Sequence, residues 1–195
     1  MSNRTVAFYN HLSFLYPLVD AFLKPQKRLL FNEVNNLPAG KLLEIGVGNG
    51  SQLRQYKKHQ VIGIDTSAAM LDIARKNGLG ITELIEMNGE ALLFDEQVFD
   101  YVVLSHVIAV VDDTEQLLQE VYRVLKPRGQ VLILNHFTPN NWFRHIDLSF
   151  EVIAKLLRFK SVFHLQDIKT MEKFTLLKEV NVGLASYFKL LIYQK

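Results

Sequence analysis

One stretch of the sequence, residues 42–50 with the letters LLEIGVGNG, limits what this chain can fold into. It begins as an apolar run typical of a buried parallel strand and continues into glycines at alternate positions, Gly46, Gly48 and Gly50. Glycine accepts positive φ angles and lets a ligand approach without a Cβ in the way. Residues 51–56 can begin a helix. This order predicts a nucleotide-type pocket at the carboxyl end of a parallel sheet.

The spacing of the glycines separates two classes of cofactor. The dinucleotide fingerprint requires G-x-G-x-x-G, whereas this chain has G-x-G-x-G preceded by the acidic Glu44. A pyrophosphate gains nothing from a neighbouring carboxylate, but a cofactor with an amino group and a sulfonium cation does. The alternative at this point is a tight strand-to-helix turn that binds no ligand.

Composition sets outer limits on function. The length of 195 residues and the hydrophobic share of 49% predict one domain with a substantial core. A net charge of +2 without a basic run argues against nucleic-acid binding. The lack of cysteine excludes a disulfide framework and a zinc-thiolate site. No signal peptide and no apolar run near the ~20 residues of a membrane span are visible, so we expect a cytoplasmic protein.

Residues 1–38 are rich in aromatic and apolar side chains, and we expect them to form a helical cap on a core made by residues 39–195. Proline is tolerated in the first turn of a helix but not inside one. Because Pro17 and Pro25 divide the segment, two or three short helices are predicted.

Two roles are open for this cap. It packs over the cofactor pocket or the sheet, or it forms an amphipathic element with Lys24, Lys27 and Arg28 facing anionic lipid headgroups. Tyr9 and Tyr16 either line a substrate site, where an aromatic face can hold an alkylammonium group, or belong to the core.

A second buried strand, residues 61–65, ends in Asp65. A carboxylate at the end of the second strand can accept hydrogen bonds from both ribose hydroxyls of an adenosine. The alternative is a helix N-cap, but Thr66 and Ser67 could cap the next helix, residues 68–76, equally well. We therefore expect Asp65 to bind ribose.

The rest of the chain alternates between strands and helices. Apolar runs predict the strands, and apolar side chains at helical spacing predict the helices. The helix predicted over residues 141–157 either packs against the sheet as a lid or contacts lipid through the aromatic and basic residues around it. The predicted strands are 81–87, 101–104, 131–134, 175–182 and 187–193, the predicted helices are 115–125 and 141–157, and a turn is predicted over 126–129.

Asn88, Gly89 and Glu90 follow the third strand, and Ser105 and His106 end the fourth. With the E-x-G-x-G-x-G stretch and the aspartate after the second strand, this resembles the class I S-adenosylmethionine-dependent methyltransferases, whose third-strand loop often reads G-D-A-x-x-L-P-F. The resemblance implies an α/β fold, a Rossmann-like seven-stranded sheet with helices on both faces and the last strand antiparallel. It also implies S-adenosylmethionine as cofactor and S-adenosylhomocysteine as product.

By that resemblance, several loops share the binding of the cofactor. Asn88 stands where the family often has aspartate, and its carbonyl can still accept a hydrogen bond from the adenine amine. Gly89 would offer its backbone N–H to adenine, and the carbonyls of Ser105 and His106 would lie near the cofactor amino group. The implied set is Glu44, Gly46, Gly48, Gly50, Asp65, Thr66, Met70, Asn88, Gly89, Glu90, Ser105 and His106.

The chain is also similar to the short bacterial phospholipid N-methyltransferases of the Rhodobacter type. Shared blocks lie at residues 44–50, 63–71, 106–112 and 183–192, and the Asn-His-Phe block at 135–137 is the most discriminating. This similarity implies stepwise methylation of phosphatidylethanolamine toward phosphatidylcholine. It further implies a monomer at an anionic membrane surface, peripheral on the inner face of the cell membrane.

The chemistry of such a reaction asks little of the protein. An amine lone pair attacks the sulfonium methyl group in line, so positioning supplies most of the barrier reduction. A base or a water path must take the proton of the amine. Tyr9, Tyr16, His106 and His136 are candidates for holding the amine, although a lone histidine is more often structural. A catalytic metal is not required.

Two other readings remain. One is a soluble methyltransferase for a metabolite or a quinone-type ring, which would be active without lipid vesicles. The other is a cofactor-binding module that has lost catalysis and acts as a regulatory or membrane-binding protein. The intact glycines, Glu44 and Asp65 argue against loss of cofactor binding but do not bear on turnover.

Overall fold

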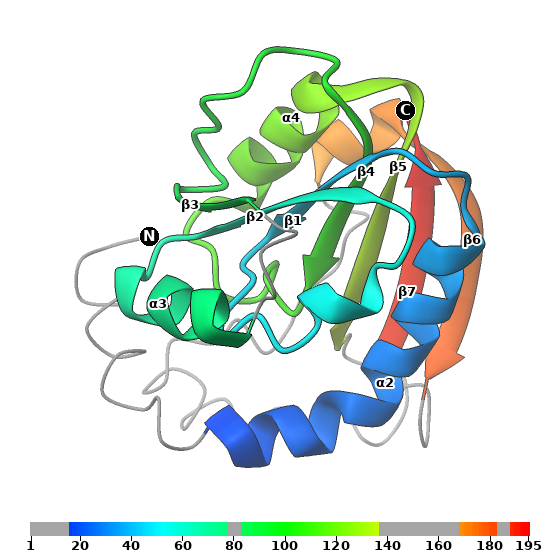
Figure 1. Ribbon diagram of the computed structural model, residues 1–195. Coiled ribbons are helices and arrows are strands. Elements are labelled where there is room, and N and C mark those ends of the chain that lie inside the picture. The colour runs from blue at the N-terminus through cyan, green and yellow to red at the C-terminus, as the bar shows by residue number, and fades with distance from the viewer. Residues whose placement is uncertain (1–15, 78–82, 137–167, 183–187) are drawn as a thin grey trace.

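The computed structural model describes residues 16–77, 83–136, 168–182 and 188–195, which form a seven-stranded sheet covered by helices (Figure 1). The spatial order of the strands is β3-β2-β1-β4-β5-β7-β6. The strands are β1 (Lys41–Ile45), β2 (Gln60–Asp65), β3 (Glu83–Glu86), β4 (Phe99–Ser105), β5 (Leu125–His136), β6 (Thr175–Val182) and β7 (Phe188–Gln194). The helices are α2 (Tyr16–Asn36), α3 (Ala68–Asn77) and α4 (Thr114–Val124), with 3-10 helices η2 (Leu53–Gln55) and η4 (Lys169–Lys173).

Strand pairing brings the carboxyl ends of β1 to β5 to one edge of the sheet. β1 pairs in parallel with β2 on one side and with β4 on the other, and β3 and β5 continue the parallel arrangement outward. β7 lies antiparallel between β5 and β6. The chain changes its direction of travel across the sheet between β1 and β4, and ligands of open α/β sheets bind at such a switch point. The predicted Rossmann-like seven-stranded architecture is confirmed.

Hydrophobic side chains cover both faces of the sheet. On one face, Leu30 of α2 and Leu71 of α3 join the cluster that contains Leu42 of β1. On the other face, Leu117 and Val121 of α4 are wholly buried in a second cluster. Alternate residues along each central strand therefore enter different cores, which explains why these strands are apolar almost throughout.

The predicted division of the amino-terminal segment at Pro25 is wrong, whereas residues 1–15 lie outside the described residues. A single helix, α2, continues through Pro25. A proline inside a helix removes one backbone hydrogen bond and crowds the preceding turn, whereas Pro17 in the first turn carries no such cost. Leu30 and Val34 are completely buried. Their packing against the sheet stabilises the later turns of α2 and offsets the cost of the proline.

The helix predicted over residues 51–56 is also wrong, because only the short η2 forms there. Asn35 of α2 explains the difference. Its Nδ2 donates to the carbonyl of Gln55 at 2.7 Å, and its Oδ1 accepts from the backbone N–H of Lys57 at 3.0 Å. These bonds use backbone groups that a longer helix would need, so the chain turns directly into β2. No helix N-terminus suited to a phosphate follows the glycine loop.

Most of the other predicted elements are confirmed with small shifts at their ends, but the strand predicted over 131–134 begins much earlier, at Leu125. α4 is capped by Asp113, whose Oδ1 accepts from the backbone N–H of Gln116 at 3.0 Å. The predicted turn over 126–129 lies inside β5, where Arg128 has a φ of 66° and the register against β4 shifts. The predicted helix 141–157, the first residues of the predicted third strand and the link over residues 183–186 lie outside the described residues.

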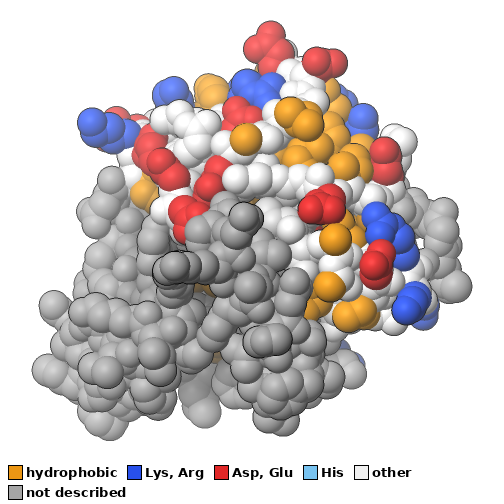
Figure 2. Space-filling view, turned by 90° about the vertical axis from the view of Figure 1, so that its left-hand side faces the viewer, with side chains coloured by type: hydrophobic (Ala, Val, Ile, Leu, Met, Phe, Trp, Pro, Cys, Tyr) orange, Lys and Arg blue, Asp and Glu red, His pale blue; other side chains and the backbone are white. Residues whose placement is uncertain are grey.

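The described surface mixes side chains of different kinds. Figure 2 shows basic, acidic and hydrophobic side chains interspersed over one face. The exposed large hydrophobic side chains are Ile73, Leu93, Leu176 and Leu177, which come from α3, the loop after β3 and β6. Among the helices that the structure describes, none is both long and apolar enough to cross a bilayer.

The packing of α2 can be tested by shortening Leu30. Leu30→Ala removes a wholly buried side chain, and we expect it to lower the free energy of unfolding by about 2–5 kcal/mol. Arg28→Ala, at an exposed position on the same helix, should change it by less than about 0.5 kcal/mol. Urea titration followed by circular dichroism measures both. Equal midpoints for Leu30→Ala and the parent chain would show that α2 is not part of the core.

Candidate cofactor site

The site is built around the glycine loop that follows β1. Gly46, Gly48 and Gly50 have φ angles of 74°, 55° and 68°, in the left-handed region that glycine adopts without strain. The N–H of Gly46 donates to the carbonyl of Ile64 in β2 at 2.8 Å. The carbonyl of Asn49 accepts from the side chain of Asn77, at the end of α3, at 2.9 Å. The loop is therefore a fixed turn tied to the second strand and its helix.

The three glycines serve different purposes. A Cβ on Gly46 would stand 2.5 Å from a methyl group of Val107, and a Cβ on Gly50 would stand 2.7 Å from the Cβ of Ala74. Packing with neighbouring elements therefore requires glycine at these two positions. A Cβ on Gly48 would meet no atom of the described residues within 4 Å. The backbone of Gly48 borders open space, which is the side that a ligand can approach.

Asp65, at the end of β2, joins the glycine loop to the start of α3. Its Oδ2 accepts from the N–H of Gly48 at 2.8 Å, and its Oδ1 accepts from the N–H of Ser67 at 2.9 Å. Burial raises the pKa of this carboxyl, and the backbone hydrogen bonds oppose that effect. The residue is half-buried. A carboxylate oxygen can accept more than one hydrogen bond, so Asp65 can bind hydroxyl groups while it supports both loops.

The start of α3 shows that Asp65 can support the turn into this helix and still be available to bind ribose. Ser67 caps the helix, because its hydroxyl accepts from the N–H of Met70 at 3.3 Å. Thr66 is half-buried beside Asp65, whereas Met70 is only 3% exposed. Thr66 can therefore face a ligand, and Met70 is mainly a core residue.

Glu44 is completely buried on the face of the sheet that α2 covers. Its Oε1 accepts a hydrogen bond from Nε2 of Gln52, the second residue after the loop. Burial raises its pKa to about 8, although the positive charge of Lys27 and the nearby Tyr56 hydroxyl act in the opposite direction. The sequence suggested a charged carboxylate beside a cation. The structure instead places a carboxyl group that is mostly protonated at neutral pH behind the loop.

The loop after β3 is hydrogen-bonded to the start of α4 through the segment 88–90. Oε1 of Glu90 accepts from the N–H groups of Asp112 and Asp113 at 2.8 and 3.0 Å, which connects the loop after β3 to the start of α4. Oδ1 of Asn88 accepts from the N–H of Glu90 at 3.0 Å. Gly89 is buried where a Cβ would overlap the core. Glu90 therefore has a structural role that the sequence did not predict.

Ser105 and His106 end β4 beside the glycine loop. Ser105 is 8% exposed, and its hydroxyl has no hydrogen-bond partner among the residues that the structure describes. His106 has a φ of 60°, which is uncommon for a residue with a side chain. Its N–H donates to the carbonyl of Leu134 at 2.8 Å, and its ring meets the edge of Phe188 at 5.8 Å between centroids. The imidazole is thus held at the carboxyl edge of the sheet.

The structure places the other residues predicted to hold an amine only in part. Tyr9 lies outside the described residues, and the side chains of Tyr16 and His136 do so as well. Tyr16 is the first residue of α2, and His136 is opposite Phe188 in the pairing of β5 with β7. Of the four candidates, His106 alone can be assigned a side-chain environment.

Two further residues belong to the site and were not identified from the sequence. Gln52 reaches back to Glu44, and Val107 packs against Gly46. Glutamine and valine carry no signal of function at these positions. Only the folding of the loop back over the end of β1, and the pairing of β1 with β4, bring them into place.

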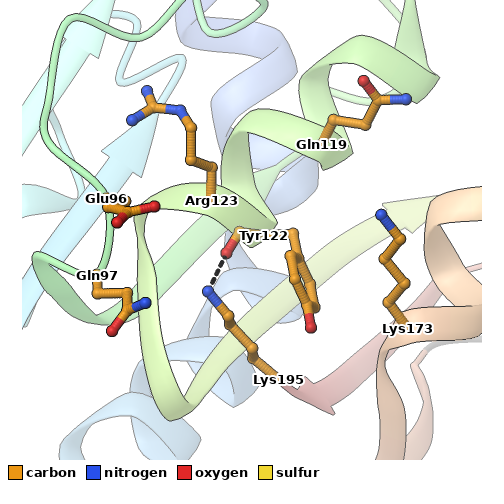
Figure 3. Close-up of a pocket in the computed structure, with 7 residues that line it drawn as sticks. All are labelled: Glu96, Gln97, Gln119, Tyr122, Arg123, Lys173 and Lys195. Carbon is orange, nitrogen blue, oxygen red and sulfur yellow. Dashed lines mark hydrogen bonds between the residues drawn. The ribbon is translucent and has the colours of Figure 1, made fainter.

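A hollow of about 610 Å³ lies away from the glycine loop, at the end of the sheet opposite the carboxyl ends of the parallel strands (Figure 3). The ammonium group of Lys195 donates to the carbonyls of Tyr122 and Leu125 at 2.7 and 2.8 Å, and it lies 4.5 Å from the centre of the Tyr122 ring. Lys173 lies 5.5 Å from the same ring. This arrangement fastens the end of β7 to the end of α4 and is separate from the glycine loop. No group of metal-ligating side chains occurs in the described parts of the chain.

Comparison with known proteins agrees with this geometry. Residues 43–133 match a family model described as a methyltransferase domain. A phosphatidylethanolamine N-methyltransferase from Cereibacter sphaeroides is 39% identical over 108 residues, which cover 52% of this chain and 53% of that protein. A ubiquinone/menaquinone biosynthesis C-methyltransferase from Desulfotalea psychrophila is 33% identical over 119 residues, 58% of this chain and 48% of that protein. The chain spans about half the length of these curated relatives.

A solved structure supports the fold over nearly the whole chain. A Thermotoga maritima protein described as an S-adenosylmethionine-dependent methyltransferase matches with a TM-score of 0.72 at 21% identity, covering 98% of this chain and 99% of that one. At this level of identity the likeness establishes the fold alone. The domain match and the fold together identify S-adenosylmethionine as the cofactor.

The residues present fit that cofactor. Gly48 borders open space, Asp65 keeps acceptor capacity for ribose hydroxyls, and the buried Ser105 hydroxyl lacks a partner among the described residues. All three lie at the carboxyl edge of neighbouring parallel strands. The cofactor carries no phosphate, which agrees with a glycine loop that no full helix follows.

The different purposes of the glycines can be measured separately. Gly50→Ala combines an unfavourable φ with overlap against Ala74, and we expect a loss of about 2–5 kcal/mol in the free energy of unfolding. Gly48→Ala meets no neighbour among the described residues and should cost only the backbone strain, about 1–2 kcal/mol. Chemical denaturation of both variants gives the comparison. Equal losses would contradict the assignment of Gly48 to the open side of the loop.

Proposed function

With its class I S-adenosylmethionine-dependent methyltransferase domain as the premise, we propose that this chain methylates the amine of phosphatidylethanolamine, stepwise toward phosphatidylcholine. The observation that supports catalysis at the glycine loop is the open side of Gly48 beside the Asp65 carboxylate. The acceptor is supported by the identity to the phosphatidylethanolamine N-methyltransferase and by the Asn-His-Phe block at residues 135–137.

In this proposal the protein fixes the cofactor from several strand ends. Asp65 binds the ribose hydroxyls, and the backbone of Gly48 approaches the cofactor closely. Asn88 and the N–H of Gly89 contact the adenine, and the carbonyl of Ser105 accepts from the cofactor amino group. The bound cofactor supplies an electrophilic methyl group on a sulfonium. The chain's own contribution is orientation and exclusion of water.

His106 is the proposed contact for the acceptor amine. Its imidazole is positioned by the left-handed backbone at the end of β4 and by the edge of Phe188. A neutral imidazole can accept a hydrogen bond from the amine or pass its proton to water. Tyr9, Tyr16 and His136 remain proposed partners in holding the same amine.

We further propose that a monomer meets the lipid headgroups at an anionic membrane surface through its amino-terminal segment. Arg28 is exposed on α2 and available for such a contact. Lys27 is half-buried, and its charge acts on Glu44, so it contributes less to the surface than the sequence suggested. Attachment of this kind is peripheral and reversible.

A second function is supported by the curated relatives. The likeness to the ubiquinone/menaquinone biosynthesis C-methyltransferases makes a quinone-type ring an alternative acceptor at the same cofactor site. A ring carbon would need its hydroxyl deprotonated rather than a free amine, and the residues at the end of β4 can serve either acceptor. The competing proposals therefore differ in the acceptor and share the cofactor site.

The cofactor assignment predicts the effect of removing the Asp65 carboxylate. Asp65→Ala should weaken binding of S-adenosylmethionine at least about tenfold, equivalent to about 1.4 kcal/mol, because two ribose contacts and the support of Gly48 are lost. Asp72→Ala removes an exposed aspartate of α3 that pairs with Arg75 and should leave affinity unchanged. Calorimetric titration measures both, with melting curves to confirm folding. Unchanged affinity in a folded Asp65→Ala would refute the pocket assignment.

The acceptor is tested by methyl transfer from labelled S-adenosylmethionine. Anionic vesicles containing phosphatidylethanolamine are compared with matched vesicles containing phosphatidylcholine and a demethylated quinone. We expect labelled mono-, di- or trimethylated lipid from the first and no labelled product from the second. Labelled quinone alone would transfer the proposal to the alternative acceptor. Cofactor binding without any labelled product would support a non-catalytic module.

A further inference from the structure

A group of buried polar side chains lies behind the glycine loop, between β1 and α2. Glu44 is 0% exposed, and Gln52 and Tyr56 are 5% and 6% exposed. Gln26 of α2 is similarly buried, and Lys27 of the same helix is half-buried. Gln52 donates to Oε1 of Glu44. The other oxygen, Oε2, has no hydrogen-bond donor among the described residues.

The surroundings of Glu44 contain few charges that could stabilise its ionised form. On either side of it in the sheet stand Gly63 of β2 and Val103 of β4. Among the described residues, α2 contributes the charge of Lys27, and the segment around η2 contributes Tyr56 and Gln52. Burial outweighs Lys27 and the Tyr56 hydroxyl, so the pKa of Glu44 rises to about 8. The carboxyl group is therefore mostly protonated at neutral pH and reaches its midpoint of ionisation near pH 8.

The position of Glu44 couples it to the loop. It stands two residues before Gly46, on the strand that leads into the loop, and its bond to Gln52 reaches the segment that leaves the loop. A charge introduced at the loop acts on a buried carboxyl through a low-dielectric medium, in which Coulombic energies are several times larger than in water. A cation bound there favours the ionised form, and an uncharged ligand does so less.

We propose that Glu44 is a proton-exchanging group that distinguishes the cationic cofactor from its product. It gives a proton to solvent when the sulfonium cofactor binds at the glycine loop. It takes a proton back once the methyl group has left and the sulfur is neutral. This inference rests on the proposed cofactor site and concerns the discrimination between substrate and product at that site.

The exchange favours turnover. The ionised Glu44 attracts the sulfonium, and this attraction disappears when the sulfur becomes neutral. The carboxyl group then regains its more stable protonated form, and the product is held less tightly than the substrate. One proton leaves on binding and one returns after transfer, so the cycle is balanced apart from the proton that the methylated acceptor releases.

Proton release can be counted by calorimetry. S-adenosylmethionine and S-adenosylhomocysteine are titrated at pH 7.5 in phosphate and in Tris, whose ionisation enthalpies differ. We expect the first ligand to release more protons than the second, by at most about 0.75 proton for a group with a pKa of about 8. Glu44→Gln keeps a side chain that can bond to Gln52 and cannot ionise, so the excess should disappear. Glu86→Gln, at an exposed position of β3, is the matched control and should keep it.

Affinities provide an independent readout. In the parent chain the preference for S-adenosylmethionine over S-adenosylhomocysteine should increase several-fold between pH 6.5 and pH 8.5, because a rising pH ionises Glu44. The ligands also ionise in this range, but they do so equally for every variant. The pH dependence of the same preference in Glu44→Gln therefore serves as the reference. Equal proton release and equal slopes in both proteins would overturn this inference and leave the cofactor site intact. Failure of both ligands to bind would overturn the proposed function as well.

The ligand-free protein gives a check that needs no cofactor. A carboxyl whose pKa is about 8 when folded, against an ordinary 4.5, stays protonated while the unfolded chain ionises. Its contribution to stability is present below pH 4.5 and is lost as pH rises toward 8. The urea midpoint of the parent chain should therefore fall relative to that of Glu44→Gln across this range. If the difference in urea midpoint between the two proteins did not change with pH, Glu44 would already be ionised in the folded state, which would contradict the proposal.

Discussion

The carboxylate of Asp65 holds together the two loops on which the cofactor site depends. The glycine loop exposes backbone N–H groups that a regular strand or helix would satisfy, and such groups need partners. Asp65 accepts from one of them and from the first turn leading into α3, at 2.8 and 2.9 Å. The same side chain thus fixes the turn, orients the helix and faces the open side of Gly48. Support and binding are combined in one residue.

The features predicted correctly from the sequence are those that local chemistry dictates. Three glycines at alternate positions require a turn with positive φ angles, and the structure has such a turn. Asp65 follows an apolar run of the right length, so its place at the edge of the sheet follows from the strand. The boundaries of β6, Thr175–Val182, agree with the prediction.

The features that were missed depend on contacts between distant parts of the chain. Pro25 argues locally against a helix, but the burial of Leu30 and Val34 outweighs it. Residues 51–56 favour a helix, but Asn35 binds their backbone from another element. The sequence suggested that Glu44 is a charged partner of the cofactor, but in the fold the side chain is completely buried and its pKa is raised. None of these outcomes can be obtained from a window of neighbouring residues.

The place of β7 in the sheet affects how the molecule is assembled. β7 comes last in the sequence order of the strands but lies between β5 and β6 rather than at the edge. While the chain is being synthesised, the outer edge of β5 therefore lacks its partner until the segment carrying Phe188–Gln194 has emerged from the ribosome. An unpaired edge of apolar residues is a template for association with other chains. Closure of this edge by β7 pairs strands that are far apart in the sequence, and such long-range pairing is intrinsically slow.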